Sequence, residues 1–84
     1  DAQGWLVKGD VLRRRAGGKV EALASAAVAY SKATQFDPRL GPAWRELGLV
    51  RRAQGRDTEA RDCFRRYLSL TPQAKDRGIV EKWI

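Results

Sequence analysis

Apolar residues recur at helical spacing along the chain, most clearly between residues 57 and 70. Ala60, Phe64 and Tyr67 stand there at i, i+4 and i+7, so they share one face of a helix. Glycines and prolines interrupt this pattern at intervals. The expected helices lie at about 4–16, 19–36, 43–54 and 57–70, and a last amphipathic helix follows at 73–84. The fold class is therefore all-α, and we expect no strand.

One glycine stands where a helix rarely places one. Trp44, Leu47 and Gly48 share a helical face at i, i+3 and i+4, although a glycine inside a helix costs roughly 1 kcal/mol relative to alanine. This cost must be offset by a stabilising contact, and the expected contact is the close packing of a second helix against the glycine. Gly48 therefore predicts a tight contact between two helices.

Four positions recur at a separation of 34 residues. The pairs are Ala26 and Ala60, Tyr30 and Phe64, Ala33 and Tyr67, and Pro38 and Pro72. A tryptophan with a glycine four residues later recurs at 39 instead, as Trp5 with Gly9 and Trp44 with Gly48. The first unit therefore holds five extra residues. We expect the first helices of the two units to agree in length to within a residue, so most of the insertion lengthens the second helix of the first unit by about one turn, near residues 19–23.

Residues with special backbone preferences mark the expected helix ends. The glycine pair at 17–18 breaks the first hairpin, and Gly55 suits the end of the third helix. Asp57 is expected to cap the fourth helix. Thr71 and Pro72 are expected to end that helix and to open the last one as its N-cap and first residue.

The period of 34 residues, with Trp-x2-Leu-Gly, then Ala-x3-Phe and then Pro, resembles the tetratricopeptide repeat family over nearly the whole chain. The second unit, about 41–72, carries the motif at Trp44, Leu47, Gly48, Gly55, Ala60, Phe64 and Pro72. It departs from the motif at Arg51 and Tyr67. The first unit, about 2–38, is looser, because Lys8 replaces the leucine and the insertion separates its helices.

The resemblance implies a single domain over 1–84, built as a right-handed superhelical solenoid of two helical hairpins plus a capping helix at 73–84. It also implies that the alanine of each second helix packs against the glycine of the first helix. Because the chain starts at Asp1 and has no methionine, we expect it to be part of a longer protein.

The resemblance further implies a protein-interaction module, a scaffold or adaptor that binds a peptide or a partner protein in a concave groove lined by the first helices. The expected groove positions are Leu6, Val7, Asp10, Arg13, Arg14, Arg45, Leu49 and Arg52. This lining is mainly basic with some apolar surface. Since arginine pairs bidentately with carboxylates, an acidic, partly apolar segment is the expected partner.

A second interpretation treats the arginines as parts of a solvated surface, balanced by neighbours one helical turn away. The candidate pairs are Asp57 with Arg61, Asp62 with Arg66, and Arg77 with Glu81. The two interpretations remain open at this point.

The net charge of +7 raises nucleic-acid binding, above all to RNA, as the alternative function. However, 12 of the 17 basic residues are arginine, a bias that a GC-rich bacterial genome also produces. The basic residues surround the helices instead of forming one stripe, and Tyr30, Trp44 and Phe64 are expected to pack inside. A protein partner is therefore favoured over a nucleic acid.

Enzymatic functions lack the residues that they need. The chain has no histidine, so the commonest general base and metal ligand are missing. Cys63 is the only cysteine and can form neither an internal disulfide nor, alone, a zinc site. Asp10 and Glu46 could form a carboxylate pair, but charge balancing explains them equally well. We expect no catalytic site, cofactor, metal, membrane span or leader, and we favour a cytoplasmic location.

The last residues form one apolar helical face, made by Ile79, Val80, Trp83 and Ile84. We expect this helix to cap the second repeat by contacting Leu47, Phe64 and Leu68. The alternative is that Trp83 and Ile84 project outward and mediate self-association.

Overall fold

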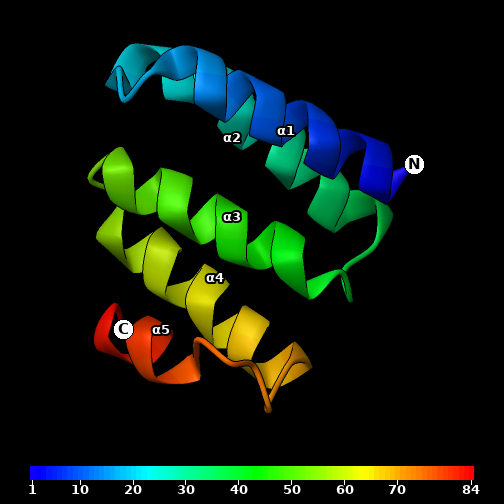
Figure 1. Cartoon of the computed structure of the whole chain (residues 1–84), viewed down its shortest axis with the longest axis vertical. Helices are drawn as coiled ribbons and strands as arrows, with labels where there is room; N and C mark the ends of the chain where they lie inside the picture. Colours follow the sequence, from blue (N-terminus) through cyan, green and yellow to red (C-terminus); the bar gives the residue numbers. More distant parts are fainter.

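A computed structural model describes all residues, 1–84, as five helices in stacked layers (Figure 1). The helices are α1 (Ala2–Ala16), α2 (Val20–Phe36), α3 (Gly41–Ala53), α4 (Asp57–Leu70) and α5 (Arg77–Lys82). The hairpin of α1 and α2 forms one end of the stack, α3 and α4 form the middle, and α5 lies at the other end. No strand is present, so the all-α prediction is confirmed. None of the five helices combines the length and the apolar character that crossing a bilayer requires.

Each hairpin closes on a glycine that faces an aromatic ring. A Cβ atom at Gly48 would lie 2.6 Å from the Phe64 ring, and one at Gly9 would lie 2.5 Å from the Tyr30 ring. The predicted tight contact is therefore confirmed, and both hairpins contain it. The atoms nearest to each glycine belong to the ring and not to the alanine that the family resemblance implied, because the longer aromatic side chain reaches further across the helix face.

The five extra residues of the first unit lengthen both helices of its hairpin. α2 has 17 residues against 14 in α4, which agrees with the prediction that α2 is longer. α1 has 15 residues against 13 in α3, so the expectation of first helices equal to within a residue is wrong. The physical reason is that antiparallel helices must lengthen together to keep their side chains facing each other. The turn at Gly17 and Gly18, both with positive φ, moves outward with them.

Two predicted helix caps take other positions. Asp57 is the first residue of α4, after Arg56, and its side chain makes no capping hydrogen bond. Its negative charge still lies in the first turn, where it interacts favourably with the positive end of the helix dipole. The Thr71 hydroxyl donates to the Tyr67 carbonyl at 2.6 Å and ends α4. Residues 71–76 form turns, so Thr71 and Pro72 do not open the last helix.

α5 packs its apolar side on α4, although it spans 77–82 and not 73–84. Val80 is fully buried, and the Trp83 ring centroid lies 5.2 Å from that of Phe64. These residues join Leu68 in one cluster, whereas Leu47 belongs to the core between the hairpins. Ile79 is 56% exposed, because a single helical turn can direct only Val80 and Trp83, at i and i+3, toward α4.

Candidate functional site

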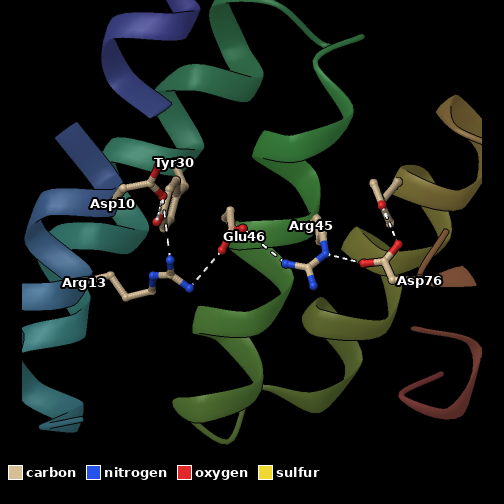
Figure 2. A network of polar contacts seen from close by, with 7 residues as sticks. Asp10, Arg13, Tyr30, Arg45, Glu46 and Asp76 are labelled. Atoms are coloured by element: carbon tan, nitrogen blue, oxygen red, sulfur yellow. Dashed lines mark hydrogen bonds and ion pairs between the residues drawn. The ribbon is translucent and has the colours of Figure 1, made fainter. Parts of the chain in front are cut away.

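A row of polar contacts starts on the first hairpin and crosses from α1 to α3 (Figure 2). The Tyr30 hydroxyl donates to the Asp10 carboxylate at 2.5 Å. The Arg13 guanidinium lies 3.9 Å from Asp10 and 3.0 Å from the Glu46 carboxylate. Since Arg13 belongs to α1 and Glu46 to α3, this ion pair links the two hairpins.

Arg45 continues the row from α3 to the turn before α5. Its Nη1 atom lies 3.2 Å from Glu46, and its Nε–H donates to Asp76 at 2.6 Å. The Tyr67 hydroxyl also donates a hydrogen bond to the Asp76 carboxylate at 2.6 Å. A tyrosine from a second helix therefore closes each end of the row. The polar row consists of Asp10, Arg13, Tyr30, Arg45, Glu46, Tyr67 and Asp76.

Every charged residue of the polar row faces an opposite charge. Arg13 and Arg45 face three carboxylates, those of Asp10, Glu46 and Asp76. The side chains of the ion pairs are partly shielded from solvent, with exposed fractions between 17% at Glu46 and 39% at Arg13. Ion pairs at this depth are screened less than pairs on an open surface. The row is therefore a fixed, charge-compensated surface and not the basic lining that the sequence suggested.

The pKa values in the row follow from these contacts. The pKa of Asp76 falls below its ordinary value because Tyr67 and then Arg45 donate hydrogen bonds to the carboxylate. Burial works against the charge of Arg45, but the hydrogen bond to Asp76 and the nearby carboxylates outweigh it and raise the pKa of Arg45. Burial, together with the hydrogen bond to Asp10, raises the pKa of Tyr30, and burial with the hydrogen bond to Asp76 raises that of Tyr67.

The predicted groove residues fall into two groups. Asp10, Arg13 and Arg45 belong to the polar row and are already paired. The others lie outside the row: Val7, Arg14, Leu49 and Arg52. Of the other positions considered for the groove, Leu6 is buried in the core between the hairpins, so its expected place in the groove is wrong.

The residues outside the row differ in exposure. Val7, Arg14 and Arg52 are exposed, and neither arginine makes an ion pair. The Arg52 guanidinium stands over the Trp83 ring, 5.5 Å from its centroid. Leu49 is partly buried against the cluster between α4 and α5. This group supplies free positive charge beside apolar surface.

The i,i+4 pairs proposed for a solvated surface form only in part. Arg77 and Glu81 approach to 3.5 Å. Asp62 pairs with Arg65 at 3.2 Å and not with Arg66. The pair of Asp57 with Arg61 is absent from the ion pairs of the chain. Five of the eight ion pairs join residues one to four positions apart, and one pair, Arg13 with Glu46, joins the two hairpins.

The role of Asp76 escaped the sequence analysis. Thirty-one residues separate it from Arg45, so no local spacing points to the contact. Glu46 was considered together with Asp10, and Arg13 lies between the two carboxylates, as charge balancing requires. This geometry favours a structural role for both acids.

The structure shows no cluster of metal-ligating side chains, and its one cysteine is buried. No group of three or more His, Cys, Asp or Glu side chains could hold a metal ion. Cys63 is buried, and burial raises the pKa of its thiol to about 11. A thiol in this state is protonated near neutral pH and is a poor nucleophile.

The surface hollows lie away from the polar row. One of 480 Å³ lies between α4 and α5, and two of 410 Å³ border α2. None of the predicted groove residues lines any hollow. The face of α1 and α3 is therefore a shallow surface and not a deep groove.

A family comparison agrees with the architecture of the second hairpin. A family model described as tetratricopeptide repeat matches residues 41–74, which include α3 and α4. No curated protein and no solved structure matches the chain. The first hairpin lies outside the matched residues, but its contact of Gly9 with Tyr30 has the same form as that of Gly48 with Phe64. Residues 41–74, which form the second hairpin and the turn after it, therefore match one tetratricopeptide repeat.

Proposed function

We propose that the chain acts as a scaffold or adaptor that binds an acidic, partly apolar protein segment across the face of α1 and α3. Tetratricopeptide repeats generally mediate protein–protein interaction, which gives the class of function. The segment's chemistry is inferred from the surface. The observation that carries the proposal is the contrast between paired and unpaired arginines on one face.

The unpaired arginines are the proposed contact residues. Arg14 and Arg52 are exposed and form no ion pair within the chain. Each guanidinium can therefore donate hydrogen bonds to a carboxylate of the partner without breaking an existing ion pair. Val7, which is 51% exposed, and the half-buried Leu49 supply apolar surface beside them. An acidic segment with apolar residues matches this combination.

The paired residues have a different proposed role. Arg13 links α1 to α3 through Glu46, and Arg45 links α3 to the turn before α5 through Asp76, so these pairs fix the surface on which the segment lies. Truncating one partner of such a half-buried pair leaves the other charge uncompensated, which destabilises the fold. Binding assays should therefore leave Arg45 intact and change Arg14 and Arg52.

A display library of acidic peptides, selected on the wild-type chain, tests the proposal. We expect the selected peptide to bind about tenfold more weakly for each arginine lost, so the Arg14→Glu, Arg52→Glu double variant should lose about 100-fold in affinity by calorimetry. The matched control is Arg39→Glu with Arg65→Glu, exposed arginines outside this face, which should lose less than threefold. Equal affinity for both double variants would show that the contact residues are wrongly assigned.

RNA is the competing partner, and the same assay separates it. Affinity for a single-stranded RNA of mixed sequence should fall steeply with salt, since it rests on neutralised phosphates. Arg13 and Arg45 are already paired with carboxylates, which reduces the charge available to phosphates. RNA binding stronger than peptide binding at 150 mM salt would overturn the proposal.

Self-association through the C-terminal end and a cytoplasmic location stay predictions. The Trp83 ring packs against Phe64, so the side chains open to a second copy at this end are Ile84 and Ile79, exposed at 38% and 56%. Analytical ultracentrifugation of the wild type and of Ile79→Ser, Ile84→Ser tests the association.

A further inference from the structure

The flank of the first hairpin carries a hollow that lies outside the face proposed above. This flank hollow has a volume of 410 Å³ and lies between α1 and α2. Its lining consists of Trp5, Lys8 and Leu12 from α1 and Ser25, Val28, Ala29 and Lys32 from α2. No residue of α3, α4 or α5 lines it, in keeping with the place of this hairpin at one end of the stack (Figure 1).

Apolar groups form much of this lining and are open to solvent. Val28 is 55% exposed, and Trp5 and Leu12 are only partly buried. Burying apolar surface is worth about 25 cal/mol per Å². A partner that places apolar side chains in the flank hollow therefore gains binding free energy.

Two lysines give the flank hollow its charge. The ammonium groups of Lys8 and Lys32 lie 5.1 Å and 5.3 Å from the centroid of the Trp5 ring. Neither lysine forms an ion pair, and no acidic residue lines the hollow. Two uncompensated positive charges beside one tryptophan favour carboxylates on the occupant.

A second copy of the chain does not provide this chemistry. The chain carries a net charge of +7 and repels its own copies. The exposed apolar residues at the opposite end, Ile79 and Ile84, lie in a segment whose acidic residues already have basic partners, Asp76 with Arg45 and Glu81 with Arg77. That end of another copy therefore brings no unpaired carboxylate side chain to the flank hollow.

The shape of the site points to a helix as occupant. The lining follows two antiparallel helices, so the depression runs along their axes. From Trp5 to Leu12 the rise along α1 is about 10 Å, which corresponds to about two turns of a partner helix. An amphipathic helix presents apolar anchors at i, i+4 and i+7 over that length.

We propose that the flank hollow binds an amphipathic helix of a partner protein whose apolar anchors are bordered by acidic residues. Val28 and Leu12 contact the anchors, and Lys8 and Lys32 pair with the bordering carboxylates. The site is separate from the face of α1 and α3, so either binding proposal can fail without the other.

The test uses two synthetic helical peptides of the same length. Both carry leucines at i, i+4 and i+7; one has glutamates beside them and the other has lysines at those positions. Binding to the intact 84-residue chain is followed by fluorescence anisotropy and by amide and indole chemical shifts. We expect the acidic peptide to bind at least tenfold more tightly than the basic one and to shift the Trp5 indole and the amides of Lys8, Val28 and Lys32.

Exposed positions allow variants that leave the core intact. Val28→Arg and the double variant Lys8→Glu, Lys32→Glu should each weaken the acidic peptide at least tenfold. Val20→Arg is the matched control on α2, since Val20 is 51% exposed and does not line the hollow. Val20→Arg and the Arg14→Glu, Arg52→Glu variant should both stay within twofold of the wild type.

Four results would overturn the proposal. Equal binding of the two peptides would remove the charge argument. Shifts confined to the face of α1 and α3, or affinity unaffected by Val28→Arg, would place the peptide elsewhere. Shifts of the Trp5 indole that follow protein concentration without peptide would show that a second copy occupies the flank hollow.

Discussion

Replacing Gly48 with alanine adds one methyl group at the closest point between α3 and α4. The new Cβ would lie 2.6, 2.8 and 3.0 Å from three atoms of the Phe64 ring, whereas carbon atoms at rest stand about 3.5–4.0 Å apart. Phe64 has no exposed surface, so its ring cannot swing outward. Either the ring leaves its rotamer or the two helices move apart by roughly 1 Å.

Two effects of opposite sign decide the stability of this variant. Alanine is favoured over glycine inside a helix by about 1 kcal/mol. Overpacking a filled core costs about 1–3 kcal/mol, and here it also separates the apolar surfaces of α3 and α4. We therefore expect Gly48→Ala to lower the free energy of unfolding by about 1–2 kcal/mol, which corresponds to a melting temperature lower by roughly 4–16 °C in a domain of this size.

Urea denaturation followed by circular dichroism measures the effect. Gly78→Ala is the matched control, because Gly78 lies in α5 and a Cβ there meets nothing within 4 Å. This control should be neutral or stabilising by up to about 1 kcal/mol. In a cycle with Phe64→Leu, the double variant should be more stable than the sum of the single changes by about 1 kcal/mol, since the smaller side chain makes room for the methyl group. Stabilisation by Gly48→Ala as large as that by Gly78→Ala would refute the close-packing explanation.

Further predictions concern the C-terminal helix and the titrating groups of the polar row. Val80→Ala should destabilise by about 2 kcal/mol in urea denaturation, because a fully buried side chain loses two methyl groups, whereas Ile79→Ala at an exposed position should change stability by less than about 0.5 kcal/mol. Tyr30 and Tyr67 are the only tyrosines and both have raised pKa values, so tyrosinate absorbance of the native chain should appear above pH 10, while the urea-unfolded chain titrates near pH 10. The pKa of Asp76 is lower in the folded chain than its ordinary value of 3.8, so the ionised carboxylate stabilises the fold above about pH 5 and this contribution is lost as the pH falls below 3.8. The Asp76→Asn variant should therefore lose less free energy of unfolding between pH 6 and pH 3 than the wild type does.

Regular elements of this fold were predictable because their signals are local. The i, i+4 and i+7 spacing of Ala60, Phe64 and Tyr67 specifies a helix face, and repetition at 34 residues indicates a second hairpin of the same kind. The glycine contacts could be predicted for the same reason. Only the identity of the facing group, a ring and not an alanine, needed the packed structure.

Contacts between layers could not be predicted in the same way. Arg13 meets Glu46 because the hairpins stack, and Arg45 meets Asp76 because the chain after α4 folds back toward α3; helical spacing carries no information about either contact. The sequence therefore indicated the arginines of the face, and Asp10 and Glu46 as acids that could balance charge, but not Asp76 and not which arginine each acid would meet. Because these pairings were not known, the sequence led us to expect a basic groove where the structure has paired charges.

The polar row connects the interaction face to the packing of α5. Arg45 and Tyr67 both bind Asp76, which directly precedes α5, and α5 places Trp83 against Phe64. Arg52, a proposed contact residue, stands over the same Trp83 ring. The position of its guanidinium thus depends on α5 as well as on α3. In our proposal α5 does not touch the partner, but it helps to set the geometry of the surface that the partner contacts.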